Sequence, residues 1–164
     1  MLEDALRNRA IPWAVFVLPG DSMIMVNKYG RRVVNESLGY DERPLIHFAY
    51  DLVRREYPNR YLFWLFDQRT LDTIGGAYPV PKDVRETPNL ITGKNADDLA
   101  ANISARLQSI AEKYGEKEQL DPDFAARLKE SIRTFNGYAK AGKDPDFHRG
   151  EQEFDKIWNR AYSA

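Results

Sequence analysis

A short polar stretch after an apolar segment carries the residue types best suited to chemistry. Asn35, Glu36 and Ser37 follow an apolar strand pattern, and Gly39 then precedes Tyr40. A tyrosine with an ordinary pKa of about 10 is a poor base at neutral pH. It becomes useful when a neighbouring positive charge or second hydroxyl stabilises the phenolate. A position behind a glycine, at the end of a polar strand, would let the hydroxyl of Tyr40 reach into a pocket.

The same residues also have a structural interpretation. Tyr40 is equally suited to cap a helix predicted after it. Asn35 and Glu36 can either hydrogen-bond the backbone of the adjoining loop or fix the orientation of the Tyr40 side chain without touching a ligand themselves. Arg31 and Arg32 flank the preceding turn, where charged side chains usually face solvent. On spacing alone, the catalytic and the structural interpretation of Tyr40 both stay open.

Other kinds of site find little support in the sequence. The chain has no cysteine, which excludes disulfides, thiolate zinc sites and cysteine nucleophiles. Its two histidines, His47 and His148, are far apart in the sequence and are interpreted as structural, so no metal site is predicted. Gly75-Gly76 is not part of a G-x-G-x-x-G motif, and no P-loop occurs. A hydrolase would need a nucleophile–base pair, and none is identified.

Size and composition fit one ordinary domain that covers residues 1–164. Hydrophobic residues make up 43% of the chain, which is enough for a core. With 24 basic and 25 acidic residues the net charge is −1, so no strong field draws the chain to nucleic acid or to an anionic membrane. No apolar run approaches the roughly 20 residues that span a bilayer. The lack of cysteine fits a reducing compartment, and we predict a cytoplasmic protein.

The first part of the chain predicts a small β-sheet. Apolar runs at 15–17 and 22–27 predict strands, and Gly30 supplies a turn with a positive φ. Residues 32–36 are then expected to return as a strand, which completes a β-hairpin. The segment Arg60–Phe66 is almost wholly apolar and predicts a central strand buried on both faces.

Helical patterns dominate the rest. Apolar spacing predicts helices over Pro44–Tyr57, from Asn95 to Tyr114, from Asp121 to Gly142 and around Phe154 to Trp158. Residues 67–92 show no sustained period and predict a long loop. Strands come first and helices mostly later, which is typical of the α+β class. We therefore expect a small antiparallel or mixed sheet with an N-terminal hairpin, packed by about four helices.

Two motifs resemble segments of one protein family. The stretch PGDSMIMVNKYGRRVVNESLGYD, residues 19–41, resembles the P-G-x-x-x-V-N-x-x-G-x-R-F-x-N-E segment of fumarate reductase-like flavoproteins. The stretch FNGYAKAGKDPDFHRGEQEFD, residues 135–155, resembles a later segment of the same substrate-capping domain. The N-E-S-L-x-Y-D sequence is most similar to the 3-ketosteroid Δ1-dehydrogenase branch. One departure is Val33, where the family has phenylalanine.

The resemblance implies roles for individual residues. Tyr40 stands where the ketosteroid dehydrogenases have an active-site tyrosine, which helps remove a substrate proton while the flavin N5 accepts a hydride. Fumarate reductases have an arginine as proton donor at that position, so a tyrosine argues against fumarate or succinate as the substrate. The residues expected to face the substrate or the flavin domain are Arg32, Asn35, Glu36, Ser37 and Gly39.

The resemblance also implies that the chain is one part of a longer enzyme. The family's FAD-binding domain, with its glycine-rich loop, has no counterpart in these 164 residues. We therefore expect a substrate-capping domain that closes over FAD and a small hydrophobic carbonyl substrate such as a ketosteroid. Alone, it is expected to bind no FAD, to be inactive, and to self-associate through an apolar face near Tyr40 and residues 67–92. The alternative is a stand-alone, non-enzymatic binding or interaction module.

Overall fold

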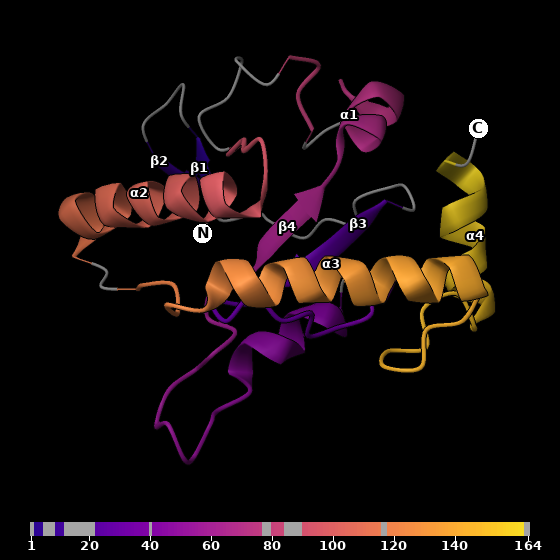
Figure 1. Ribbon diagram of the computed structural model, residues 1–164, viewed down its shortest axis with the longest axis horizontal. Coiled ribbons are helices and arrows are strands. Elements are labelled where there is room, and N and C mark those ends of the chain that lie inside the picture. Colours follow the sequence, from indigo (N-terminus) through magenta and orange to yellow (C-terminus); the bar gives the residue numbers. More distant parts are fainter. Residues whose placement is uncertain are drawn as a thin grey trace.

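The protein is described by a computed structural model that covers residues 2–4, 9–11, 22–39, 41–76, 80–83, 90–115 and 118–162. A short two-stranded sheet crosses close to two long helices, and a further helix stands near the C-terminus (Figure 1). This mixture of a small antiparallel sheet and separate helices confirms the predicted α+β class. The predicted strand at 15–17 and the residue Tyr40 lie outside the described residues.

The described strands form two antiparallel pairs. Strand β1 (Leu2–Asp4) pairs with β2 (Arg9–Ile11). Strand β3 (Met23–Val26) pairs with β4 (Phe63–Phe66), in a register that places Met25 opposite Trp64. Because side chains alternate along a strand, Met25 and Trp64 share one face of this sheet.

Both predictions about strand pairing need correction. The strand predicted at 22–27 is confirmed as β3, but residues 32–36 do not return beside it as a strand, and only a single bridge joins Val26 to Arg32. The partner of β3 is instead β4. Strand β4 is also not fully buried, because all four of its residues stay partly exposed, and among the described residues β3 is its one strand partner.

The helices, in chain order, are η1, a 3₁₀ helix (Arg43–Phe48), α1 (Gln68–Ile74), α2 (Ala96–Tyr114), α3 (Phe124–Ala141) and α4 (Glu153–Tyr162). The predictions for α2, α3 and α4 are confirmed. Asn95 caps the start of α2, because its side chain accepts the backbone N–H groups of Asp97 and Asp98 at 3.0 Å each. It ends at Gly115, which has a φ of 73°. A polar cap and a terminal glycine in a left-handed conformation are local signals, which is why sequence reasoning found them.

Two other helix predictions were wrong. The helix expected over Pro44–Tyr57 is limited to η1, because the Asp51 side chain accepts the backbone N–H groups of Val53 and Arg54 and closes a tight loop instead. The loop expected over 67–92 contains α1, which begins where Asp67 accepts the N–H of Thr70 at 3.0 Å. A helix of seven residues is too short to show a clear apolar period.

The turn after β3 packs directly on α3. Gly30 has a φ of 71°, which confirms the positive φ predicted there. A Cβ atom on Gly30 would lie 2.5 Å from the carbonyl oxygen of Phe124 and 2.9 Å from the backbone nitrogen of Leu128. Glycine is thus required both by the backbone conformation and by the close approach of α3. The Ser131 hydroxyl adds a hydrogen bond to the Gly30 carbonyl at 2.8 Å.

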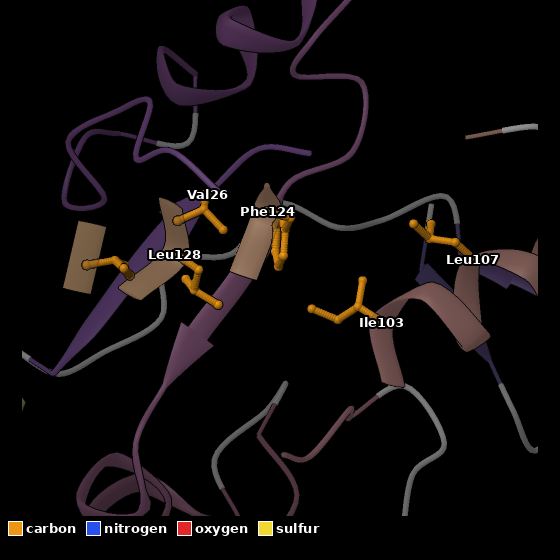
Figure 2. Close-up of a cluster of buried hydrophobic side chains, with 6 residues drawn as sticks. Val26, Ile103, Leu107, Phe124 and Leu128 are labelled. Carbon is orange, nitrogen blue, oxygen red and sulfur yellow. The ribbon is translucent and has the colours of Figure 1, made fainter. Parts of the chain in front are cut away.

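The main hydrophobic core lies between the β3–β4 sheet and the helices α2 and α3. Figure 2 shows Val26, Phe124 and Leu128 gathered on one side of this core, with Ile103 and Leu107 extending from α2. The Phe63 ring of β4 meets the Phe124 ring edge-on, with centroids 5.8 Å apart. The apolar spacing of α2 and α3 predicted one buried stripe on each helix, and the structure shows both stripes in this core.

The opposite face of the β3–β4 sheet has its own small cluster. Met23 on β3, Ile74 on α1 and Val80 are buried together, with Trp64 and Phe66 of β4 packed against them. This face is the one that carries Met25 and Trp64, and it lies beside the polar residues described below.

Large apolar side chains are exposed on the segment that follows Tyr40. We call this set the apolar surface; it consists of Leu45, Phe48, Tyr50, Leu52, Val53 and Tyr57, with exposed fractions from 46% to 92%. Apolar exposure was expected near Tyr40 and in residues 67–92, and the described part of 67–92 has no large hydrophobic residue in the exposed class. Within the described residues, no helix is long and apolar enough to cross a membrane.

Candidate functional site

Glu36 is the centre of a buried cluster of charged side chains. It is fully buried, and its Oε1 accepts the backbone N–H of Met25 at 2.9 Å. The same carboxylate accepts hydrogen bonds from the guanidinium groups of Arg32 and Arg149. A buried carboxylate is tolerated when its charge is paired and its lone pairs are used. Glu36 therefore joins strand β3, the turn after it and the loop between α3 and α4.

Arg32 binds Glu36 through two parallel hydrogen bonds. Its Nε donates to Oε1 and its Nη2 to Oε2, both at 2.8 Å, and Nη2 also lies 2.7 Å from Oδ2 of Asp144. The rings of Phe135 and Phe147 lie 5.1 and 4.8 Å from the guanidinium carbon. Only 7% of the Arg32 side chain is exposed, so the expectation that charges at this turn face solvent is wrong for Arg32.

The loop after α3 supplies the second arginine and a second carboxylate. Nη1 of Arg149 donates to the carbonyl of Met23 at 2.8 Å and to Glu36 at 3.2 Å. Asp144 accepts the backbone N–H groups of Phe147 and Arg149, which folds the loop back on itself. Arg149 thus attaches this loop to the sheet as well as to the Glu36 carboxylate.

Asn35 makes a separate connection to helix α4. Its side-chain nitrogen donates to Asp155 Oδ2 at 3.0 Å, and the backbone N–H of Gly150 donates to the same oxygen at 2.9 Å. Its side-chain oxygen accepts the backbone N–H of Ser37 at 2.9 Å. Asn35, Ser37 and Asp155 are all buried. Residues of the first motif therefore bind residues of the second motif, although the two are more than a hundred positions apart.

The residues on either side of Tyr40 are attached to this cluster. The carbonyl of Gly39 accepts the backbone N–H of Arg43 at 3.0 Å, and Nη1 of Arg43 donates to the backbone carbonyl of Glu36 at 3.3 Å. Tyr40 itself is outside the described residues, so its proposed role stays a prediction. The same is true of the expectation that Arg32, Asn35, Glu36, Ser37 and Gly39 face substrate or flavin; what the structure shows is their partners within this chain.

Burial and ion pairing act in opposite directions on Arg32, Arg149 and Asp144. Burial acts to lower the pKa of Arg32, but its bonds to Glu36 and Asp144 outweigh burial and raise that pKa. Burial lowers the pKa of Arg149, against the opposing charge of Glu36. For Asp144, burial acts to raise the pKa, yet the hydrogen bond and charge of Arg32 outweigh it and lower the pKa below its usual value. Arginine remains protonated in proteins at neutral pH, so both guanidinium groups carry a positive charge.

A shallow hollow of about 300 Å³ lies beside α3, and Arg32 is among the residues that line it. Its lining includes Arg127 and Tyr138, which are already paired with Asp121 at 2.7 Å and with Asp146 at 3.1 Å. None of the described residues next to Tyr40 lines it. Among the residues that the structure describes, no group of three histidine, aspartate or glutamate side chains is placed to hold a metal ion.

Sequence reasoning did not name Arg43, Asp144, Arg149 or Asp155 as site residues. The only signal was the second motif, whose D-P-D-F-H-R-G stretch contains Asp144 and Arg149. Nothing local indicates that Arg149 would bind Glu36, which lies 113 positions earlier. The two histidines were interpreted correctly as structural: His47 bonds the backbone oxygen of Asn59 at 2.6 Å, and His148 bonds Glu151 in its own loop.

Comparison with known proteins identifies relatives that are dehydrogenases. The chain is 31% identical over 147 residues to 4-oxocyclohexanecarboxylate 2-dehydrogenase of Sinomonas cyclohexanicum, a match that covers 89% of this chain and 22% of that protein. It is 31% identical over 157 residues to 3-oxosteroid 1-dehydrogenase of Mycolicibacterium smegmatis, covering 90% of this chain and 24% of that protein. The chain thus spans less than a quarter of the length of these curated relatives, and no family model matches it. The predicted resemblance to ketosteroid dehydrogenases is confirmed.

Proposed function

The chain is a relative of the 3-oxosteroid and oxocyclohexanecarboxylate dehydrogenases over most of its own residues, and on this premise we propose that it is the substrate-capping part of an FAD-dependent ketone dehydrogenase. In this proposal the remainder of the enzyme binds FAD, and this chain closes over the flavin and the substrate. The observation that carries the proposal is the cluster around Glu36. It joins the two motifs that the family resemblance rests on, and it holds the described residues on both sides of Tyr40.

FAD does not fit this chain as its own binder. The sequence has no glycine-rich turn between a strand and a helix, which is the usual cradle for the pyrophosphate of a dinucleotide. The polar groups of the Glu36 cluster are mostly bonded to one another. FAD would therefore be held by the rest of the enzyme, where it would supply the hydride acceptor.

The contribution of this chain is the proton transfer at Tyr40. A carbon next to a ketone releases a proton only to a base placed beside it, and a phenol with a pKa of about 10 needs a stabilised phenolate for that role. Arg43 follows Tyr40 by three positions, and its backbone N–H bonds the Gly39 carbonyl. A cation this close in the chain suits the stabilisation of a phenolate. We propose Tyr40 as the residue that takes the substrate proton.

The apolar surface suits contact with the flavin-binding part. Phe48, Leu52 and Val53 are 75%, 82% and 92% exposed, and they directly follow the segment that contains Tyr40. Exposed apolar groups that lie together usually mark an interaction site. Closing this surface on the rest of the enzyme would exclude water from the reaction at Tyr40. The proposed substrate is a cyclic ketone, as the names of the relatives suggest.

Substitution of Tyr40 tests the proposal. In the full-length natural protein, assayed with a cyclic ketone and an artificial electron acceptor, Tyr40→Phe is expected to lower kcat by about a hundredfold or more. Tyr114→Phe, at the exposed end of α2, is the matched control and should leave kcat unchanged. Unchanged turnover in Tyr40→Phe would remove Tyr40 from the mechanism. Flavin that co-purifies with the isolated 164-residue chain would contradict the capping role.

A further inference from the structure

One nitrogen of the Arg32 guanidinium is buried and unused. The Arg32 side chain is 7% exposed, and its Nε and Nη2 atoms bond Glu36 and Asp144. The third nitrogen, Nη1, is buried and has no hydrogen-bond partner among the described residues. Buried donors are almost always hydrogen-bonded, because a donor left without a partner costs free energy. Arg32 therefore needs an acceptor that the described part of the chain does not supply.

The hollow of about 300 Å³ beside α3 is the space from which an acceptor can reach Arg32. Arg32 lines this hollow, and so do Phe135 and Phe147. The centres of the two rings lie 5.1 and 4.8 Å from the guanidinium carbon. Because Glu36 and Asp144 occupy the other two nitrogens, Nη1 is the donor of Arg32 that is left for a group bound in the hollow. The volume is at the lower end of the range for small-molecule sites.

Further side chains of the hollow are free to donate. Arg31 is exposed, and neither its guanidinium nor the Thr134 hydroxyl bonds another side chain or backbone group among the described residues. The two carboxylates in the described lining are already occupied. Glu130 forms an ion pair along α3, and Asp146 accepts a tyrosine hydroxyl at 3.1 Å. The groups left for a ligand are therefore donors, and two of them carry a positive charge.

This set of donors matches a phosphate group. A phosphate carries negative charge and at least three strong acceptor oxygens, whereas a carboxylate has two oxygens. Arg31 and Arg32 come from the turn after β3, and Thr134 comes from α3, so the donors border the hollow from two elements. Hydrogen bonds between a guanidinium and a phosphate are among the stronger ones in proteins. The rings of Phe135 and Phe147 add apolar surface for an organic group attached to the phosphate.

We propose that the hollow beside α3 binds a phosphate group, which accepts hydrogen bonds from Arg32 Nη1, Arg31 and Thr134. The phosphate is the free ion or the phosphate of a small organic ester. The site is separate from the proposed proton transfer, because none of the described residues next to Tyr40 lines the hollow. Bound phosphate joins the turn after β3 to α3, and it stabilises the folded protein by mass action.

Calorimetric titration with inorganic phosphate tests the site without turnover. In the full-length natural protein, with chloride holding the ionic strength constant, we expect saturable binding with a Kd of about 1 mM or lower. Thr134→Val keeps the shape of the side chain but removes the hydroxyl, and it should weaken binding about tenfold. Arg31→Gln should weaken binding about fivefold, because that guanidinium is exposed. Lys140→Gln removes an exposed positive charge from α3 outside the hollow and is the matched control.

Two results of this titration would overturn the proposal. The first is the absence of saturable phosphate binding to the unaltered protein. The second is binding that Thr134→Val and Arg31→Gln both leave unchanged, because the phosphate would then lie elsewhere in the enzyme. Both substitutions remove groups without a partner among the described residues, so each variant is expected to keep the unfolding midpoint of the unaltered protein.

Two further ligands define the chemical class. Phenyl phosphate that binds more tightly than inorganic phosphate would assign the site to an organic ester in contact with Phe135 and Phe147, and equal or weaker binding would assign it to the free ion. Benzoate has the same ring but only two oxygens, and it is expected to bind at least about tenfold more weakly than phenyl phosphate. If benzoate binds as tightly as phenyl phosphate, phosphate is the wrong class of ligand and the proposal fails.

Discussion

The cluster around Glu36 and the apolar surface reverse the usual distribution of side chains in opposite ways. The cluster buries three arginines and three carboxylates, namely Arg32, Arg43, Arg149, Glu36, Asp144 and Asp155. The apolar surface instead places large hydrophobic residues in solvent, with Val53 92% exposed. Both arrangements cost free energy in this chain considered alone. They differ in how far the chain itself compensates that cost.

The charges of the cluster are mostly compensated from within. Glu36, Asp144 and Asp155 each accept at least two hydrogen bonds from groups of this chain. Only Arg43 lacks a carboxylate among the described residues. The polar residues of the two motifs therefore hold the two segments together.

The apolar surface, in contrast, is held in place but not covered. Asp51 accepts the N–H of Val53 at 2.8 Å, and Lys28 Nζ bonds Glu56 at 2.5 Å, so polar contacts fix the base of the loop. The apolar tips remain in solvent. Exposed apolar groups that lie together usually mark an interaction site. The difference teaches that the motif residues hold the domain together, while the apolar surface is the part that we propose to contact the rest of the enzyme.

Removal of Glu36 should break the cluster most severely. Glu36→Ala leaves the buried charges of Arg32 and Arg149 without their shared partner, and we expect the free energy of unfolding of the chain to fall by about 3–5 kcal/mol. Urea denaturation followed by circular dichroism measures this loss. Glu130→Ala, which removes an exposed carboxylate paired with Arg133, is the control and should change little. A loss below about 1 kcal/mol for Glu36→Ala would contradict the central role of Glu36. If Glu36→Ala does not fold, the isosteric Glu36→Gln serves for the same measurement.

Replacement of Arg149 should have a smaller effect. Arg149→Met keeps an apolar stem but removes the hydrogen bonds to Met23 and Glu36, while Arg32 still neutralises Glu36. The expected loss in the free energy of unfolding is about 2–3 kcal/mol. In the double variant with Glu36→Gln the two losses should not add, because both residues belong to one network. Full additivity would show that Arg149 acts independently of Glu36.

Asp144 should make the cluster sensitive to acid. The folded-state pKa of Asp144 lies below its unfolded value of about 4, so its contribution is complete above that pH and is lost as pH falls through the folded pKa. Asp144→Asn is expected to cost about 1–2 kcal/mol at pH 7. The difference in unfolding free energy between the two proteins should shrink steadily below about pH 4. A difference that stays constant down to pH 2 would show that the charge of Asp144 contributes nothing.

The apolar surface should tolerate change with the least effect on stability. Phe48→Ser, Leu52→Ser and Val53→Ser are each expected to alter the free energy of unfolding by no more than about 0.5 kcal/mol, because most of each side chain is exposed in the folded chain. The combined variant should reduce the self-association that we expect of the isolated chain. Light scattering over a range of concentrations measures it. If the unaltered chain is a strict monomer at every concentration, the expectation that the apolar surface causes self-association is wrong.

Local signals allowed part of the fold to be predicted. Asn95 and Gly115 mark the ends of α2, and both act over a few residues through capping and a positive φ. Gly30 marked the turn after β3 in the same way. The helix predicted over Pro44–Tyr57 failed because the Asp51 side chain offered the backbone competing hydrogen bonds, which a periodicity argument does not weigh.

The amino-acid sequence by itself determined the α+β class, the two long helices and the relationship to ketone dehydrogenases. Periodicity, helix caps and motifs each depend on residues that are close together in the sequence. Only the tertiary structure decided that β4 rather than residues 32–36 pairs with β3, and that Glu36 finds Arg149 113 positions away. It also decided that Arg43 is buried without a carboxylate among the described residues. The physical reason is range: burial and ion pairing depend on which distant segments meet, and that is settled when the helices and the sheet pack together.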